Sequence, residues 1–358
     1  MNNNKVKVAI NGFGRIGRAF LKVSRERDDI EVVAVNDLGD IHNFAYLLKH
    51  DTAYRESKFD VSVKADNSAF IITGTGVQAG KNQEVLFVSE KDPTKLPWGQ
   101  LGVDVVVEST GLFTSSEKAQ AHIVAGAKRV VVSAPIKDDP ASPVQGATIL
   151  MGMDEAKTVE SFKSCQITSN ASCTTNAGSP LLAILDATVG VEKALLNTVH
   201  GYTASQSLVD GPSKKDWREG RAAAMNTVPS STGAAIAVTK VMTQLKGLFD
   251  GISIRVPVVT GSIVDITFIS KRNTTAEEIN DIFKKAAADA RWQGIFTFTE
   301  EPLVSSDIIG NRHASIADLA FTRVVGGNLV KVLAWYDNEM GYTYTLVEHV
   351  IKAGKLIK

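Results

Sequence analysis

The sequence predicts an α/β protein, with a doubly wound parallel sheet in its first half and a mixed α+β domain on a mostly antiparallel sheet in its second half. Three observations predict this fold class. Short apolar strands alternate with helical segments up to about residue 170. A glycine-rich turn directly follows the first strand. Beyond that point the strand-like runs become longer and the rhythm of alternation changes.

In the first half, strands and helices alternate in the order that builds parallel sheets. The apolar, β-branched run Lys5–Ile10 predicts a buried strand, and the apolar spacing in Arg15–Arg27 predicts a helix. A further helix should begin at Thr114, with Glu117 completing a capping box, and end at Gly126. The other expected elements are strands at 31–36, 103–107 and 129–132, a helix at 41–49 and antiparallel hairpins between 58 and 88.

The second half has four longer strand-like runs, separated by helical segments. We expect strands at 194–199, 252–259, 263–270 and 330–336, and helices near 173–188, 233–245, 276–290 and 338–355. The stretch 203–226 has no clear period, and a loop of that length in a compact domain is usually functional or lies at an interface. The expected first domain is residues 1–172, completed by a C-terminal helix at 338–358. The expected second domain is residues 173–337.

Charge balance and cysteine count exclude several classes of protein. The 358 residues include 39 Lys and Arg and 39 Asp and Glu, so the net charge is zero and no dedicated nucleic-acid site is expected. Two cysteines are too few for a disulfide framework or a four-thiolate metal site. No apolar run approaches the roughly 20 residues of a membrane span, and the N-terminus has no signal-peptide pattern. We expect a cytoplasmic protein that binds neither metal nor membrane.

The turn between the first strand and the first helix reads Gly12-Phe13-Gly14-Arg15-Ile16-Gly17, a G-x-G-x-x-G pattern. In this context Gly12 permits a tight turn, Gly14 lets the backbone approach a pyrophosphate, and Gly17 lets helix and strand pack closely. Asp37 ends the next strand, 20 residues after Gly17, at the spacing typical of an acid that binds the ribose hydroxyls. These residues predict a dinucleotide site of the Rossmann type, with NAD preferred over NADP because Asp37 repels a 2′-phosphate.

Cys173 and His200 are the candidate catalytic pair. Cys173 lies at the start of a predicted helix, where the macrodipole and unpaired N–H groups favour a thiolate. Pro180 falls inside that helix, so the helix is either kinked or begins later. His200 follows the strand 194–199, and a helix–loop–strand return can bring its imidazole beside the thiol. A thiol–imidazole pair is the arrangement of nucleophilic catalysis.

Eight segments, in order, resemble those of the phosphorylating glyceraldehyde-3-phosphate dehydrogenases over nearly the whole chain. They are Asn11–Arg18, Glu108–Thr114, Ser133–Pro135, Ser169–Asn176, Asp210–Ser213, Ser231–Ala234, Arg255–Pro257 and Trp335–Tyr342. The segment around the cysteine, Ser-Asn-Ala-Ser-Cys-Thr-Thr-Asn, is highly specific for that family. The resemblance implies that the second domain is catalytic and that the protein is a glycolytic oxidoreductase.

The resemblance also implies roles for individual residues. Cys173 would be the nucleophile and His200 its base. Arg15 and Ile16 would contact the cofactor pyrophosphate. The residues implied for the rest of the cofactor are Asp37, Lys91, Ser133, Asn338 and Tyr342. Those implied for the substrate phosphate and the incoming phosphate are Ser172, Thr174, Thr203, Arg221, Thr232, Gly233 and Arg255.

The implied reaction oxidises glyceraldehyde 3-phosphate with NAD and inorganic phosphate to 1,3-bisphosphoglycerate, through a cysteine thiohemiacetal and a thioester. The resemblance further implies a homotetramer in which the loop 203–226 contacts a neighbouring subunit. Two departures stand out: Ala177 replaces a second cysteine, and Ser207 replaces a basic residue that is common near the phosphate sites.

Other functions remain open. An erythrose 4-phosphate dehydrogenase would use the same scaffold but release a free acid by hydrolysis. A cysteine hydrolase would use the thiol–imidazole pair without a nucleotide, so the glycine turn and Asp37 count against it. A non-catalytic, nucleotide-bound interaction protein is disfavoured by the intact Cys173–His200 pair and the zero net charge.

Overall fold

The chain divides into two compact units in a computed structural model that describes residues 5–214 and 216–357. The first unit comprises Met1–Ile149, Ala156–Asn170 and Leu346–Lys358, and the second comprises Leu150–Glu155 and Ala171–Thr345. The change of unit after Asn170 lies within two residues of the expected boundary. The chain returns to the first unit at Leu346, whereas the sequence analysis expected this return at residue 338. The segment Leu150–Glu155, which the sequence assigned to the first domain, belongs to the second unit.

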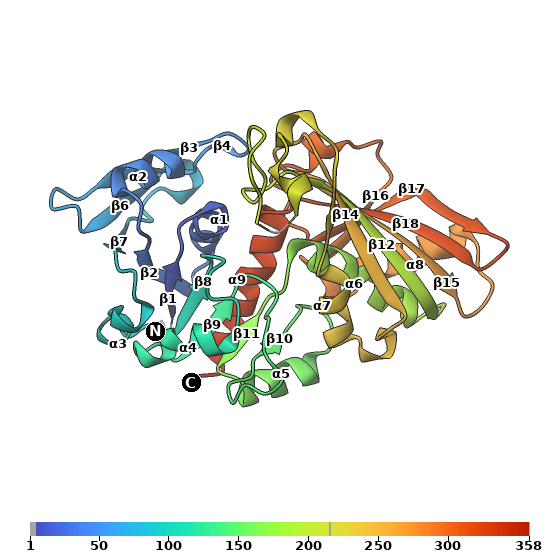
Figure 1. Cartoon of the computed structure of the whole chain (residues 1–358), viewed down its shortest axis with the longest axis horizontal. Coiled ribbons are helices and arrows are strands. Elements are labelled where there is room, and N and C mark those ends of the chain that lie inside the picture. Colours follow the sequence, from blue (N-terminus) through green and yellow to red (C-terminus); the bar gives the residue numbers. More distant parts are fainter. Residues whose placement is uncertain (1–4, 215, 358) are drawn as a thin grey trace. The chain divides into compact units, whose positions relative to one another are not determined.

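The first unit is built on a nine-stranded sheet in the order β10-β11-β9-β8-β1-β2-β7-β6-β5 (Figure 1). All neighbours from β10 to β7 pair in parallel, and the β7-β6-β5 edge is antiparallel, as the alternation in 58–88 predicted. The strands are β1 Val6–Asn11, β2 Ile30–Asn36, β5 Phe59–Val63, β6 Ala69–Gly74, β7 Gln83–Val88, β8 Val105–Glu108, β9 Arg129–Val132, β10 Ala147–Thr148 and β11 Ile167–Ser169.

The strand order reverses direction at β1, which has β2 on one side and β8 on the other. In open α/β sheets, ligands bind outside the carboxyl ends of the strands at such a switch point. The helices that connect or cover this sheet are α1 Arg15–Ser24, α2 Ile41–Lys49, α3 Trp98–Leu101, α4 Ser116–Val124 and α5 Glu155–Ser164. The short strands β3 His50–Asp51 and β4 Arg55–Glu56 form a separate pair.

Helix α4 corrects one sequence prediction. It begins at Ser116, and its N-cap is Ser115, whose side chain accepts a hydrogen bond from the Lys118 backbone N–H. The predicted capping box on Thr114 and Glu117 is therefore wrong by one residue. Two hydroxyl residues stand next to each other at this start, so spacing alone does not choose between them.

The second unit is built on a seven-stranded sheet in the order β13-β14-β12-β15-β18-β17-β16 (Figure 1). The β12-β14 and β16-β17 pairs are parallel, and the other pairs are antiparallel. The strands are β12 Val191–Gly201, β13 Val228–Ser231, β14 Phe249–Val256, β15 Ser262–Ser270, β16 Phe296–Thr299, β17 Ser315–Val325 and β18 Leu329–Tyr336. The sequence analysis missed β13, β16 and β17.

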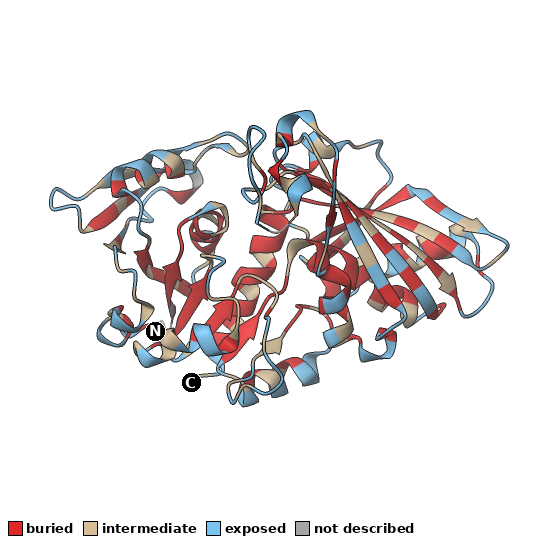
Figure 2. Ribbon diagram, viewed as in Figure 1, coloured by how far each residue is buried: buried red, intermediate tan, exposed pale blue. Residues whose placement is uncertain are grey.

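One face of this sheet is covered by helices and the other is open. The helices α6 Cys173–Asp186, α7 Ala234–Val241 and α8 Ala276–Ala287 share one hydrophobic core with the strands. Strand β12 shows the alternation directly, since Leu196 is 2% exposed and Leu195 is 66% exposed. The same alternation of buried and exposed positions runs along the neighbouring strands in Figure 2.

Two further helices settle questions left by the sequence. Helix α6 begins at Cys173 and continues through Pro180 to Asp186, so the proline does not delay its start. The helix near the C-terminus, α9, spans Met340–Lys355.

The glycines of the first turn predict different effects on stability. A Cβ at Gly17 would lie 2.2 Å from the Gly12 carbonyl oxygen, whereas a Cβ at Gly14 would meet no heavy atom within 4 Å. We expect Gly17→Ala to lower the free energy of unfolding by about 1–3 kcal/mol through overpacking. Gly14→Ala should leave it within about 0.5 kcal/mol. Denaturant titration of both variants checks this, and equal midpoints would contradict it.

Candidate active site

Cys173 is the first residue of α6, and its neighbours hold the start of that helix rigidly. The Ser172 side chain caps the helix by accepting a hydrogen bond from the Thr175 backbone N–H at 3.2 Å, and its Oγ lies 2.7 Å from the Thr175 hydroxyl. Ala171, two residues before the thiol, has a φ of 54°, a left-handed conformation that is unusual for a residue with a Cβ. Such strain persists only where the surrounding structure enforces it, and it is common at functional sites.

His200 lies near the end of β12, with its Nε2 3.4 Å from the Cys173 Sγ. The other ring nitrogen, Nδ1, lies 2.6 Å from the carbonyl oxygen of Gly201. The Gly201 carbonyl only accepts hydrogen bonds and so favours a proton on Nδ1, whereas the Arg255 guanidinium, whose Nη1 lies 2.7 Å from the same nitrogen, only donates and opposes that proton. In the tautomer with the proton on Nδ1, the Nε2 lone pair faces the sulfur and can take a proton from the thiol.

Burial controls the charge state of this pair. It raises the pKa of the Cys173 thiol, although the Arg255 charge and the hydrogen bonds offered at the helix start act in the opposite direction. Burial also lowers the pKa of His200 to about 4, and Arg255 lowers it further. In the free protein both groups are thus neutral at pH 7, with the proton on sulfur. The sequence analysis expected the helix start alone to favour a thiolate, and that expectation is wrong for the resting site because desolvation outweighs it.

Arg255 lies beside His200 because β12 and β14 pair in parallel with these two residues in register. One guanidinium nitrogen, Nη1, is 2.7 Å from His200 Nδ1. The buried Nε of Arg255 has no hydrogen-bond partner among the described residues. Within the same part of the chain, no carboxylate forms an ion pair with this guanidinium. A cation placed in this way is suited to an anionic ligand.

Tyr336 is a site residue that the sequence analysis missed. Its hydroxyl lies 2.9 Å from the Thr174 hydroxyl and 2.7 Å from that of Thr198, and its ring meets the His200 ring edge-on, with centroids 5.9 Å apart. Burial raises the pKa of the Tyr336 phenol, which therefore stays protonated. The sequence feature that could have identified Tyr336 is its position at the end of the alternating run 330–336, on the same face of the strand as Ala334.

The other residues that were expected to bind phosphate are less closely grouped in the second unit than Cys173, His200 and Arg255 are. Arg221 is exposed and paired with Asp210 at 2.9 Å. The Thr203 hydroxyl lies 3.0 Å from that of Ser205. The Thr232 hydroxyl accepts a hydrogen bond from the Ala234 backbone N–H, and Gly233 is the N-cap of α7. The Thr174 hydroxyl lies 2.9 Å from that of Tyr336, and either group can be the donor.

The residues expected to bind the dinucleotide form the turn between β1 and α1. Gly12 has a φ of 95°, and a Cβ there would lie 2.6 Å from the Thr110 backbone nitrogen. Gly14 is the N-cap of α1, with open space where a side chain would be. Asp37 accepts hydrogen bonds from the backbone N–H groups of Phe13 at 2.6 Å and Gly39 at 3.0 Å. The carboxylate is thereby tied to the glycine turn.

The remaining cofactor candidates differ in how firmly they are held. The Arg15 guanidinium is paired with Asp51 at 3.0 Å, Ile16 is half-buried in the first turn of α1, and Lys91 is exposed. Ser133 follows β9 and donates its backbone N–H to the Glu108 carbonyl.

In the second unit, the Asn338 side-chain oxygen accepts hydrogen bonds from Thr260, Gly261 and Ser262. Tyr342 is buried and donates its hydroxyl to the Ala171 carbonyl oxygen at 3.3 Å.

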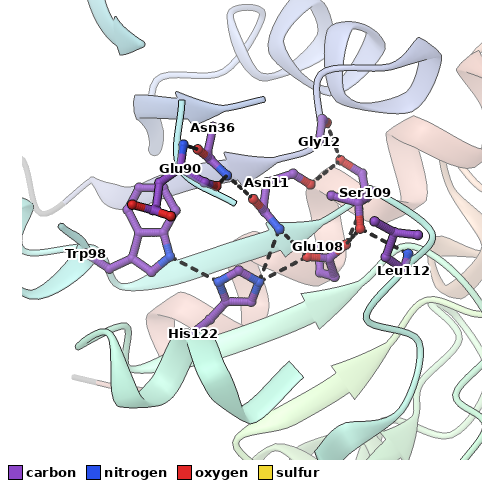
Figure 3. Close-up of polar contacts among 10 residues, drawn as sticks. Asn11, Gly12, Asn36, Glu90, Trp98, Glu108, Ser109, Leu112 and His122 are labelled. Atoms are coloured by element: carbon purple, nitrogen blue, oxygen red, sulfur yellow. Dashed lines mark hydrogen bonds and ion pairs between the residues drawn. The ribbon is translucent and has the colours of Figure 1, made fainter. Parts of the chain in front are cut away.

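Sequence reasoning also missed a buried polar network at the carboxyl end of the first sheet (Figure 3). It centres on Glu108 and His122, which are 2% and 0% exposed.

Among the described residues, no group of three or more His, Cys, Asp or Glu side chains is arranged to hold a metal ion. No helix within the same residues is long and apolar enough to cross a membrane.

Comparison with known proteins assigns the family. Residues 6–116 match the NAD binding domain of glyceraldehyde 3-phosphate dehydrogenase, and residues 172–338 match its C-terminal domain. A glyceraldehyde-3-phosphate dehydrogenase of Streptomyces coelicolor is 46% identical over 350 residues, 98% of each chain. Those of Mycobacterium avium and Clostridium pasteurianum are 46% and 43% identical over 355 and 356 residues, covering 98% of this chain and 99% of each relative. Because both halves match and the likeness extends along nearly the whole length, the chain belongs to the glyceraldehyde-3-phosphate dehydrogenase family, NAD-dependent oxidoreductases that act on an aldehyde.

Proposed function

We propose that this protein converts glyceraldehyde 3-phosphate, NAD and inorganic phosphate to 1,3-bisphosphoglycerate, with Cys173 as the nucleophile and His200 as the base. The observation that carries the proposal is the 3.4 Å contact between the Cys173 Sγ and the Nε2 of His200. A neutral thiol beside a neutral, correctly oriented imidazole needs no preformed thiolate, because the proton moves as sulfur attacks.

In the first step the Cys173 sulfur attacks the aldehyde carbon while His200 takes the thiol proton and returns it to the former carbonyl oxygen. The product is a thiohemiacetal on Cys173. His200 then removes the hydroxyl proton of this adduct as the carbon loses hydride, which leaves a thioester. NAD, when bound, supplies the acceptor for that hydride.

In the second half of the reaction inorganic phosphate attacks the thioester carbon and the Cys173 sulfur leaves. The leaving thiolate departs at the start of α6, where the backbone N–H groups and Arg255 favour negative charge. The proton held by His200 then returns to sulfur, which regenerates the neutral pair.

The dinucleotide fits the turn in the first unit. The open space at Gly14 admits a pyrophosphate to the N-terminus of α1, where free N–H groups favour an anion. The Asp37 carboxylate, already oriented by two backbone N–H groups, can still accept hydrogen bonds from ribose hydroxyls. Three donors hold the side-chain oxygen of Asn338, so its amide N–H₂ is the group available for the nicotinamide carboxamide oxygen.

Two phosphate groups require positive or N–H donors in the second unit. We assign Arg255 to one of them, because its buried Nε lacks a partner among the described residues. Arg221, Thr203, the N-terminus of α7 at Thr232 and Gly233, and the capped start of α6 at Ser172 and Thr174 are the other proposed donors.

An assay of NAD reduction with glyceraldehyde 3-phosphate, with and without inorganic phosphate, tests this function. We expect reduction that depends on phosphate and an acyl phosphate as product. Cys173→Ala should abolish acyl-enzyme formation while leaving NAD affinity within about twofold. His200→Asn should slow hydride transfer by roughly 10²–10⁴-fold, the usual effect of losing a general base.

Other outcomes of the same assay identify the competing functions. Phosphate-independent oxidation that prefers erythrose 4-phosphate would identify the erythrose enzyme. Hydrolysis without NAD would identify a cysteine hydrolase, and NAD binding without turnover would identify an interaction protein.

Arg255→Gln should shift the titration of the catalytic pair upward. The guanidinium favours the thiolate of Cys173 and opposes the imidazolium of His200, so its loss raises both pKa values. Because the thiolate is the reactive form, the pH at which iodoacetamide alkylation of Cys173 accelerates should increase. Mass spectrometry across a pH series measures the rate, and Arg218→Gln, at an exposed ion pair with Asp216, is the control. An unchanged or lower profile would show that Arg255 does not act on the pair.

We also propose that four copies of the chain assemble and that the protein works in the cytoplasm. The open face of the second sheet carries exposed apolar side chains, among them Leu195 on β12 and Ile252 on β14. The loop 203–226 adds Leu208, Trp217 and Met225, each more than 80% exposed. Apolar surface of this kind is typical of subunit interfaces. Both cysteines are free, which suits a reducing compartment.

Sedimentation analysis tests the assembly. The wild-type chain should sediment as a tetramer, and Leu195→Lys combined with Ile252→Lys should give smaller species, because charges on the open face oppose association. Val124→Lys, at an exposed position on α4 in the first unit, should leave the tetramer intact. A monomeric wild type would exclude the proposed assembly.

A further inference from the structure

Three polar side chains lie next to one another at the carboxyl ends of adjacent strands in the first unit. Asn11 ends β1, Asn36 ends β2 and Glu108 ends β8, and the strand register pairs Asn11 with both of the others. All three are at least 95% buried. Figure 3 shows their side chains linked across the end of the sheet. Buried polar groups in this number are costly unless each is satisfied, so their hydrogen bonds define their orientation.

Glu108 sets the orientation of the two amides. Its carboxylate, which only accepts hydrogen bonds, is bonded to Asn11 Nδ2 at 2.6 Å, to the backbone N–H of Thr110 at 2.8 Å and to the Thr110 hydroxyl. Asn11 must therefore present its amide nitrogen to Glu108 and its oxygen to Asn36, whose Nδ2 lies 2.7 Å away. Asn36 also exchanges two hydrogen bonds with the backbone of Glu90.

His122 and Trp98 complete the network from the other side. The Trp98 indole N–H, which can only donate, lies 3.1 Å from His122 Nδ1. The ring proton is therefore on Nε2, which lies 3.0 Å from Glu108 Oε2 and donates to it, the same oxygen that accepts from Asn11 Nδ2. A protonated imidazole would place an N–H group against the indole N–H. Trp98 thus orients His122 so that its Nε2 donates to the carboxylate.

The same residues frame the turn that we propose binds the dinucleotide. Ser109, next to Glu108, donates its hydroxyl to the Gly12 carbonyl oxygen at 2.7 Å. The Gly12 backbone N–H donates to the Asn36 carbonyl oxygen at 2.9 Å. Asp37 directly follows Asn36, and its carboxylate accepts the Phe13 N–H. A shift of Asn36 or Glu108 would therefore move both the turn and the acid.

We propose that Trp98, His122 and Glu108 are positioning residues for the cofactor: through the Asn11 and Asn36 amides they hold the Gly12 turn and the Asp37 carboxylate in the geometry that binds NAD. The inference rests on the proposed cofactor site. None of the three residues needs to touch the dinucleotide, and none takes part in the chemistry at Cys173.

Two substitutions of His122 test this role. His122→Leu removes the donor to Glu108, and we expect the Kd and KM for NAD to increase roughly tenfold, as for one lost buried hydrogen bond. The kcat and the rate of Cys173 alkylation should stay within about twofold. His122→Gln restores an N–H donor near the position of Nε2 and should recover most of the NAD affinity. Trp98→Phe, which keeps an aromatic ring but lacks the indole N–H, should weaken NAD binding to an intermediate extent.

His349 provides the matched control, because it is also fully buried in the first unit and hydrogen-bonded, to Thr168 and Asn170. His349→Leu should destabilise the protein to a similar degree, by thermal unfolding, without changing NAD affinity. Equal losses of affinity in both Leu variants, or no loss in His122→Leu, would overturn the inference. If His122→Leu does not fold, the His122→Gln and Trp98→Phe titrations decide. A wild-type protein that fails to bind NAD would instead refute the proposed cofactor site.

Discussion

The proposed chemistry depends on one partly buried contact, between the sulfur of Cys173 and the Nε2 of His200. The Gly201 carbonyl favours the proton on Nδ1, the tautomer in which Nε2 accepts from sulfur, whereas the Arg255 guanidinium beside the same nitrogen opposes it. Burial raises the pKa of the Cys173 thiol and lowers that of the His200 imidazole, so it favours the neutral form of both partners.

Positive charge is placed around this contact by strand pairing. The parallel register of β12 and β14 sets Arg255 beside His200, where the guanidinium favours the thiolate and opposes the imidazolium. The same guanidinium lacks a carboxylate partner among the described residues, so an anionic ligand can compensate its charge. In the proposed mechanism, Arg255 would therefore couple the binding of an anionic substrate to proton transfer at Cys173.

The first unit uses a different device, a buried chain of donors and acceptors behind the glycine turn. Every orientation in it follows from two groups with fixed roles, the acceptor-only carboxylate of Glu108 and the donor-only indole of Trp98. Reversing the Asn11 or the Asn36 amide would oppose two donors or two acceptors at hydrogen-bond distance, so the network favours the orientation described. Rigidity of that kind is valuable where a backbone must approach a pyrophosphate closely, since Gly12 and Gly14 have no side chains to hold their part of the turn.

The sequence by itself determined the α/β class, the glycine turn with Asp37 and the helix start at Cys173, because these depend on periodicity, on glycine's conformational freedom and on local helix capping. It predicted that a strand return can bring His200 beside the thiol, and the tertiary structure decided that it does. It located α2 at Ile41–Lys49 to the residue but placed the cap of α4 one residue early. Only the tertiary structure decided that burial outweighs the helix start in setting the thiol's charge, that Arg255 and Tyr336 adjoin His200, and that Trp98, His122 and Glu108 meet. Those outcomes depend on desolvation and on contacts between residues tens or hundreds of positions apart, and no pattern along the chain encodes them.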